Sequence, residues 1–239
     1  MAIPHTFVSL LDVLGYKNKI NEDRQNGKEE FRKKLESSLS VLGGINETEI
    51  SYQAISDTII VSAHPSTPFA EFLKTLARVH RSFLKNGLFI RGGISFAPHF
   101  RSGPLTYSHA LPIAYEIEQK QAIYPRIVID KNIIAMMMPG EKLESEISNI
   151  KNEKLICREN GIFFLNIVGE FPEECHALAK GIYDSERTFL EGNEHELAKH
   201  RWLQNFIVTL SKPRLELYMG EIEVFDPSDQ IERRTTTSE

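Results

Sequence analysis

Two aspartates interrupt apolar segments of the sequence, where an ionised side chain is unfavourable unless its charge is compensated. Asp12 lies inside the mostly apolar run 6–14, and Asp57 lies between two other short apolar runs. Burying an unpaired carboxylate is costly unless a cation or hydrogen bonds compensate it. If these segments pair as neighbouring strands, both carboxylates reach one edge of a sheet. Carboxylate oxygens suit Mg²⁺ or Mn²⁺, which complete their shells with substrate phosphates.

Each aspartate also has an ordinary structural interpretation. Asp12 could cap a following helix, and Asp57 could be a simple turn residue, because Asp is common in both roles. Residue spacing alone does not choose between the metal site and these two roles.

The elements that must position the aspartates follow from the periodicity of apolar residues. The run 6–14 predicts a buried strand, and helical spacing over 17–42 predicts one or two helices. Runs 49–55 and 58–63 are separated by two residues, so they predict a tight hairpin with Asp57 at its tip. The remaining predicted elements are a helix over 69–84, a strand over 88–96, a helix over 108–122, a strand over 124–129, a hairpin over 153–168 with an Asn-Gly turn, and two helices over 172–210 split near Gly192-Asn193.

This order of elements is that of a ferredoxin-like α+β domain, in which an antiparallel or mixed sheet carries helices. We therefore predict a domain over residues 1–170 and a C-terminal helical extension over residues 171–239, ending in a polar tail after Pro227.

Composition narrows the partners and the compartment. The net charge is −5, with Lys and Arg scattered among the acids, so the sequence predicts no nucleic-acid partner. Two cysteines are too few for a disulfide framework. The sequence shows neither a signal-like N-terminus nor a run of about twenty apolar residues, so we expect a cytoplasmic protein with no membrane association.

Four segments resemble motifs of class III nucleotide cyclases, in the same order along residues 6–168. The segment FVSLLDVLGY (7–16) resembles their F-x-D-[IV]-x-G-[FY] strand and turn, and AISDTI (54–59) resembles their hairpin G-D signature with Ser56 in place of Gly. RGGIS (91–95) is similar to the R-x-G-I strand. AYEIEQKQA (114–122), followed by the strand YPRIVID, falls where those enzymes have A-x-R-[ML]-E.

The resemblance implies a nucleotide cyclase fold and a metal-dependent reaction on a nucleoside triphosphate. Asp12, Asp57 and the backbone carbonyl of Val13 would hold two divalent metal ions, Mg²⁺ or Mn²⁺. The ribose 3′-hydroxyl would attack the α-phosphorus and displace pyrophosphate. Because cyclases of this kind assemble their sites between two subunits, the resemblance also implies a homodimer.

The residues at the base-recognition positions depart from the purine pattern. Gln53 stands where purine cyclases have Lys or Glu, and the second position falls near Leu105 and Thr106. The neighbouring Tyr52 is expected to narrow the pocket, with an ordinary strand tyrosine as the alternative. These features resemble the pyrimidine (uridylate or cytidylate) cyclases of bacterial Pycsar antiphage systems, whose cyclic product activates a downstream effector. The resemblance implies conversion of UTP or CTP to cUMP or cCMP, and the amide of Gln53 matches either base.

The phosphate-binding positions depart as well. The Asn and Arg of purine cyclases align with Pro112 and Glu116, so other cations must neutralise the triphosphate. The candidates that we predict, each with a structural role as its alternative, are Arg91, Lys120, Arg126 and Lys199. Arg91 and Arg126 join the two aspartates in the predicted catalytic set, and Lys120 joins Tyr52, Gln53, Leu105 and Thr106 in the predicted substrate site.

Two other functions remain open at the level of sequence. A chain that has lost the Asn and Arg equivalents could be a catalytically degenerate nucleotide-binding or regulatory module of the cyclase fold. A purine nucleotide cyclase with an unusual base pocket is the other alternative, and the identity of the cyclic product separates it from a pyrimidine cyclase.

Overall fold

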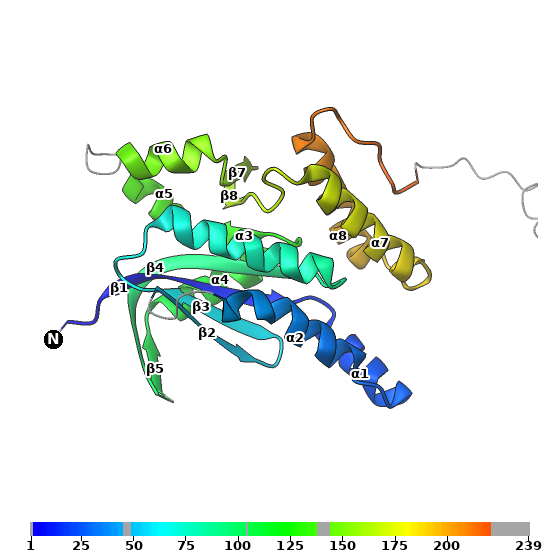
Figure 1. The fold of residues 1–239 in the computed structure, drawn as a ribbon, viewed down its shortest axis with the longest axis horizontal. Coiled ribbons are helices and arrows are strands. Elements are labelled where there is room, and N and C mark those ends of the chain that lie inside the picture. Colours follow the sequence, from blue (N-terminus) through cyan, green and yellow to red (C-terminus); the bar gives the residue numbers. More distant parts are fainter. Residues whose placement is uncertain (1, 45–48, 104, 138–143, 221–239) are drawn as a thin grey trace, which may run out of the picture.

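The computed structural model describes residues 2–44, 49–103, 105–137 and 144–220 (Figure 1). The strands are β1 (His5–Val13), β2 (Ile50–Ile55), β3 (Thr58–Ala63), β4 (Ile90–Ser102), β5 (Leu105–Ser108), β6 (Ile127–Ile129), β7 (Ile156–Glu159) and β8 (Ile162–Leu165). The helices are α1 (Tyr16–Asn26), α2 (Glu30–Gly43), α3 (Phe69–Lys85), α4 (Ala110–Gln121), α5 (Lys131–Met137), α6 (Glu144–Asn152), α7 (Pro172–Leu190) and α8 (Glu194–Leu210).

The strands form one sheet in the order β2-β3-β1-β4-β6-β8-β7, and β5 pairs with β4 beside this path. The central strand β1 is antiparallel to both β3 and β4, whereas β4 and β6 are parallel. Helices connect β1 to β2 and β3 to β4, so the order β4-β1-β3-β2 is that of the ferredoxin-like βαββαβ unit. The α+β fold with a mixed sheet, predicted from the sequence, is confirmed.

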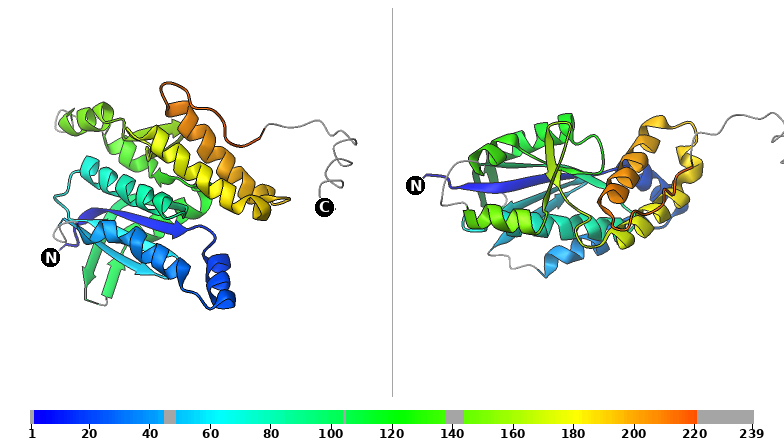
Figure 2. Two further views of the ribbon diagram at one scale, coloured as in Figure 1. Left: turned by 45° about the vertical axis from the view of Figure 1, so that its right-hand side comes forward. Right: turned by 90° about the horizontal axis from the view of Figure 1, so that it is seen from above.

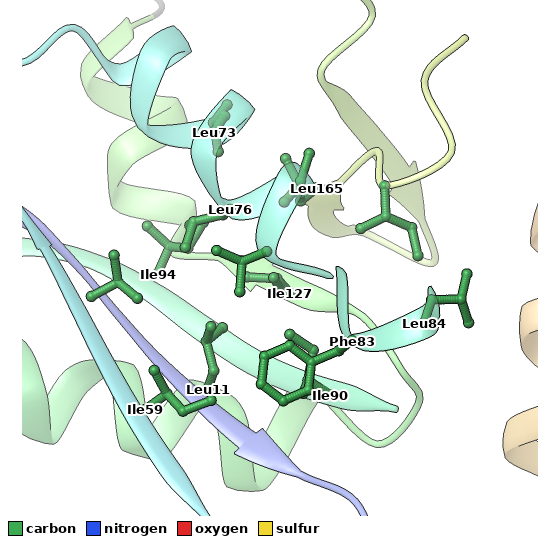
Figure 3. Packing of buried hydrophobic residues seen from close by; sticks show 14 of the residues in the cluster. Leu11, Ile59, Leu73, Leu76, Phe83, Leu84, Ile90, Ile94, Ile127 and Leu165 are labelled. Carbon is green, nitrogen blue, oxygen red and sulfur yellow. The ribbon is translucent and has the colours of Figure 1, made fainter. Parts of the chain in front are cut away.

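The main hydrophobic core lies between the sheet and α3. Leu11 and Ile59 are direct partners in the β1-β3 ladder, and both are buried. Figure 3 shows them below Leu76 of α3 and beside Phe83 and Ile90. The apolar stripe that predicts α3 from the sequence is therefore the face that the helix buries.

The opposite face of β1 and β4 is covered by α4. Val8, which alternates with the core residues of β1, packs with Ala97 and Ala110. Gly93 makes this approach possible, because a Cβ atom there would lie 2.3 Å from the carbonyl oxygen of Ala114. The Arg-Gly-Gly segment thus lets α4 lie directly on the strand.

Three short elements were not predicted from the sequence. They are β5, which forms a hairpin with the extended end of β4, and the helices α5 and α6. The segment between the predicted strand 88–96 and the predicted helix 108–122 was expected to be a loop, because it is rich in Pro, Gly and Ser. A strand as short as β5 contains too few residues to show a period. The strand expected over 88–96 instead runs on to Ser102.

The two C-terminal helices pack against the rest of the molecule and add to the same main core (Figure 2). They separate where the sequence predicts, because Gly192 has a φ of 73° and the side chain of Asn193 accepts a hydrogen bond from the Glu196 N–H. The predicted boundary at residue 170 falls between β8 and α7. The residues of α7 and α8 that are buried in the main core include Cys175, Ala179, Ile182, Leu203 and Ile207.

The polar tail predicted after Pro227 lies outside the described residues. Among the helices that are described, none has the length and apolar character needed to cross a membrane.

Candidate active site

The tip of the β2-β3 hairpin lies against the end of β1. Asp12 is the ladder partner of Thr58, and the Val13 N–H donates a hydrogen bond of 3.0 Å to the backbone oxygen of Asp57. Ser56 has a φ of 58°, in the left-handed region that favours glycine. The hairpin therefore brings Asp57 to the same sheet edge as Asp12.

Both aspartates lie close to Glu118, on the face of the sheet that α4 covers. Leu11 and Val13 belong to the main core, so the alternation of side chains turns Asp12 to the other face. There it meets Glu118 of α4, whose pKa is raised above its ordinary value chiefly by burial. The negative charges of Asp12 and Asp57 both raise it further. The two carboxylates are thus neighbours of one buried carboxyl group.

Arg91 joins these acids into one network. Its Nε donates to Asp12 Oδ2 at 3.1 Å, and its Nη1 donates to the carbonyl of Ala122 at 3.4 Å. Its Nη2 lies 2.7 Å from Oε1 of Glu118, an ion contact without the direction of a hydrogen bond. Arg91, predicted to be catalytic, is therefore placed to orient Asp12 and to compensate the charge of Glu118.

Glu118 is a site residue that the sequence reasoning missed, although a signal was present. Ala110, Ala114 and Glu118 recur every four residues and are all buried on the sheet-facing side of α4. A carboxylate in line with two small residues predicts a buried acid with a cationic partner.

The donor set fits divalent metal ions whose remaining ligands come from a substrate. Asp12 uses one carboxylate oxygen for Arg91, and the Asp57 carboxylate makes no hydrogen bond within the described residues. Two carboxylates and the Val13 carbonyl are oxygen donors of the kind that Mg²⁺ combines with phosphate and water. In the described part of the chain, His, Cys, Asp and Glu form no group of three or more that would hold a metal ion without such additional ligands.

Gln53 and Tyr52 lie on opposite faces of β2. Gln53 pairs with Ile60, which packs near the core under α4, so its side chain shares a face with Asp12. Tyr52 pairs with Val61 of the main core and therefore faces the other side. Alternation therefore turns Tyr52 away from the face that carries Asp12, whereas Gln53 shares that face. The roles expected for Tyr52 and Gln53 in base recognition stay predictions.

The second base-recognition position lies on an arm made by the end of β4 and β5. Thr106 pairs with Arg101, whose Nη1 donates to the carbonyl oxygen of Tyr52 at 3.1 Å. This contact ties the arm to β2, below which it projects in Figure 1. Leu105, 59% exposed, leaves an apolar side chain open on it.

The other predicted cations have partners of their own. Arg126 donates to Glu159 Oε2 at 3.1 Å and stands 5.4 Å from the ring centre of Trp202, in an enclosure that leaves it 5% exposed. Lys120 pairs with Glu116 on the surface of α4, and Lys199 pairs with Glu196. Among the four cations predicted from the sequence, Arg91 is the one that contacts an aspartate of the site in the described structure.

Comparison with known proteins gave matches among solved structures. Neither a protein-family model nor a curated protein sequence matches the chain. The guanylyl cyclase domain of the RhoGC fusion protein from Blastocladiella emersonii aligns at 10% identity and a TM-score of 0.45, covering 69% of this chain and 95% of that one. The guanylate cyclase domain of RhGC from Catenaria anguillulae, in complex with GTP, aligns at 10% identity and a TM-score of 0.45, over 70% of this chain and 98% of that one.

A bacterial light-regulated adenylyl cyclase aligns at 12% identity and a TM-score of 0.40, covering 76% of this chain and 100% of that one. Similarities at this level assign no activity to the chain, so its function has to be argued from its own residues.

Proposed function

We propose that this protein is a nucleotide cyclase that converts a nucleoside triphosphate into its 3′,5′-cyclic monophosphate and pyrophosphate. One observation carries the proposal. The hydrogen bond between Val13 and Asp57 holds the hairpin tip at the end of β1, where Asp12 emerges on the same side of the sheet. Two acidic side chains at one edge of the sheet are an arrangement for handling a triphosphate through metal ions.

The residues that would hold the metal ions are Asp12, Asp57 and the carbonyl of Val13. Bound there, two Mg²⁺ or Mn²⁺ ions supply charge neutralisation for the triphosphate and favour ionisation of the attacking hydroxyl. Arg91 keeps one oxygen of Asp12 fixed, so that the carboxylate presents its other oxygen. In the reaction the bond between O3′ and the α-phosphorus forms, the bond to the pyrophosphate oxygen breaks, and the proton of the hydroxyl leaves to solvent.

The charge balance supports a homodimer. Arg91 is paired with Asp12 and Glu118, and the other predicted cations pair elsewhere, so positive charge for the triphosphate has to come from further groups. We propose that a second copy of the chain supplies part of it. Apolar side chains are exposed on the elements around the site, as a contact between copies requires. They are Ile55 on β2, Leu105 and Tyr107 on β5, and Ile113 and Tyr115 on α4. Light scattering that finds a monomer at working concentrations would contradict this part of the proposal.

The decisive test is a product assay. Purified protein is incubated with each of the four common nucleoside triphosphates and Mn²⁺ or Mg²⁺, and products are identified by mass spectrometry. We expect a cyclic monophosphate and pyrophosphate. Asp12→Asn and Asp57→Asn should each lower the rate by about 100-fold or more without changing the circular dichroism spectrum. Turnover that survives both substitutions would refute the assignment.

We further propose that the base is a pyrimidine, UTP in preference to CTP, and that the product serves as a signal to a separate effector in antiphage defence. Gln53 supports this, because its amide lies on the same face as Asp12 and offers one donor and one acceptor to a pyrimidine edge. Gln53→Ala should lower kcat/KM for the preferred base by about tenfold or more, while leaving turnover of a poor substrate nearly unchanged.

A second candidate function rests on the same geometry. Arg126, Lys120 and Lys199 each form an ion pair with a glutamate of the same chain. If they stay paired, they do not stabilise the transition state of the triphosphate, and the protein binds a nucleotide without converting it. Calorimetry that shows saturable binding of a triphosphate, with no product by mass spectrometry, selects this alternative.

A further inference from the structure

The fold buries the carboxylate of Glu118 beside the two aspartates. Glu118 lies on the sheet-facing side of α4, and its side chain is 1% exposed. Its backbone nitrogen lies close over β4, because a Cβ atom at Gly93 would be 3.1 Å from it. The close packing of α4 on the strand therefore fixes the point from which this acidic side chain extends.

The charge of this carboxylate is compensated by Arg91. Oε2 of Glu118 accepts a hydrogen bond of 2.6 Å from the side chain of Gln119, whereas Oε1 has no hydrogen-bond partner within the described residues. Oε1 instead lies 2.7 Å from Nη2 of Arg91. A carboxylate as buried as this one is unfavourable without a cation, so Glu118 holds the guanidinium close to itself.

The guanidinium of Arg91 is shared between two acids. Arg91 and Asp12 are ladder partners on neighbouring strands, a placement in which opposite charges pair directly. Nη2 nevertheless lies 2.7 Å from Glu118, whereas Nε lies 3.1 Å from Asp12. A cation that is divided between two carboxylates neutralises each of them less than it would neutralise one alone. Asp12 therefore keeps more of its negative charge.

The charge of Glu118 also acts on both aspartates. Burial raises the pKa of Glu118, and the negative charges of Asp12 and Asp57 raise it further. An electrostatic interaction is mutual, so an ionised Glu118 makes the surroundings of both aspartates more negative. A divalent cation that binds between them is stabilised by that additional charge.

We propose that Glu118 is a positioning residue that raises the affinity of Asp12 and Asp57 for divalent metal ions, because it draws the guanidinium of Arg91 away from Asp12. Glu118 acts through Arg91 and is not itself a metal ligand. This role rests on the proposed function, since it concerns the same two aspartates. Residues that orient a metal ligand commonly change metal affinity by about 10- to 100-fold when they are replaced.

Binding of Mn²⁺ alone to the full chain, without nucleotide and at pH 8, tests this role. The electron paramagnetic resonance signal of the unbound ion gives the dissociation constant, and circular dichroism checks that each variant is folded. We expect saturable binding by the wild type that Asp12→Asn and Asp57→Asn abolish. Glu118→Gln should bind Mn²⁺ about tenfold more weakly or worse, because the guanidinium then pairs with Asp12 alone.

Glu116→Gln is the matched control. Glu116 lies on the same helix and loses the same charge, but it is exposed and pairs with Lys120 instead of Arg91. The dissociation constant for Mn²⁺ in this variant should stay within about twofold of the wild-type value, because solvent and salt screen an exposed charge.

The double variant Arg91→Gln/Glu118→Gln separates this role from a merely structural one. It removes the cation and its buried partner together, so Glu118 leaves no uncompensated charge behind. Asp12 is then free of the guanidinium, and the Mn²⁺ affinity should return to within about threefold of the wild-type value. If Glu118 only stabilised the fold, the double variant would bind Mn²⁺ at least as weakly as Glu118→Gln does.

Weaker binding in Glu118→Gln, with recovery in the double variant, supports the role. An unchanged dissociation constant in Glu118→Gln overturns it, as does a double variant without recovery or a wild type without saturable Mn²⁺ binding. Failure of the cyclase proposal gives a different result. In that case the wild type and its variants bind Mn²⁺ as expected, but the product assay finds no cyclic nucleotide.

Discussion

At the scale of single residues, the guanidinium of Arg91 links two acids with different surroundings. The side chain of Asp12 is 21% exposed, whereas that of Glu118 is 1% exposed. A charge as buried as that of Glu118 needs a partner, so Arg91 is required for the stability of α4 on the sheet as well as for orienting Asp12. Loss of activity on changing Arg91 therefore has to be separated from loss of stability, whereas the Asp12 and Asp57 variants avoid this ambiguity.

His80 provides a pH dependence that is unrelated to the active site. It is wholly buried on α3, its Nε2 lies 3.3 Å from the Pro125 carbonyl, and burial lowers its pKa from 6.5 to about 4. The unfolded chain binds a proton below pH 6.5, but the folded chain does not. The stability contributed by neutral His80 is therefore present above that pH and is lost as the pH falls toward 4, by about 3 kcal/mol in total.

Urea unfolding at pH values from about 7 to about 4.5 measures this loss. His80→Gln is the control, because its amide still donates to the Pro125 carbonyl and does not ionise. The difference in unfolding free energy between the wild type and His80→Gln should shrink or reverse as the pH falls. A difference that stays constant would show that His80 is not responsible.

Sequence reasoning at this scale found the aspartates but not their surroundings. Asp12 and Asp57 were recognisable because acidic residues interrupt apolar runs. The spacing of Glu118 from Ala110 and Ala114 is a weak signal. The burial of that side of α4 depends on how closely Gly93 lets the helix approach, which is a tertiary property, so Glu118 was missed. Tyr52 could have been placed by counting alternation from Gln53, since neighbouring strand residues face opposite sides.

At the scale of elements, α4 lies so close to β4 that Gly93 has the least room for a side chain among the glycines that the structure describes. A Cβ at Gly93 would lie 2.3 Å from the Ala114 carbonyl oxygen and 3.0 Å from Cβ of Ile117. Gly93→Ala should therefore push α4 away from the sheet and lower the free energy of unfolding by about 2 to 3 kcal/mol.

Urea denaturation of the purified variant gives this number. Gly43→Ala is its control, because an added Cβ at Gly43 meets no atom within 4 Å and a helical alanine is favoured over glycine. The control should be at least as stable as the wild type. Equal stability of Gly93→Ala and the wild type would mean that α4 lies farther from β4 than described.

Elements with a long and regular pattern were predictable from the sequence, and short ones were not. The β2-β3 hairpin, α3 and the pair α7 and α8 follow from alternation, from helical spacing and from the Gly192-Asn193 break. The hairpin of β7 and β8 turns at Asn160 and Gly161, with φ values of 48° and 76°, as its Asn-Gly sequence indicates. The β4-β5 arm depends on contacts with β2, which no local pattern contains.

At the scale of the whole molecule, α7 and α8 complete a core that the first part of the chain begins. Phe164 of β8 packs edge-on against Trp202 and Phe206, with ring centroids 5.6 Å and 5.4 Å apart respectively. Trp202 also donates to Glu159 at 2.9 Å. A chain that ends at Glu170 would expose the apolar surface that these helices cover.

We therefore expect the chain that ends at Glu170 to lose its cooperative thermal transition, as followed by circular dichroism. A chain that ends at Gly220 keeps both helices and serves as the control, with a transition close to that of the full chain. Cooperative melting of the shorter chain at an unchanged temperature would establish that residues 1–170 fold independently of the extension.

The turn after β1 connects the proposed metal site to a cavity beside α1. Leu14 and Gly15 line a cavity of about 510 Å³ between α1 and the C-terminal helices, and they directly follow Val13, whose carbonyl we propose as a metal ligand. A molecule in the cavity and metal ions on the aspartates would therefore both contact the segment 13–15. If this segment couples the two sites, each ligand changes the dissociation constant of the other by the same factor, because the four binding steps close a thermodynamic cycle. The concentration of a molecule that binds in the cavity would then change the affinity of the aspartates for metal ions.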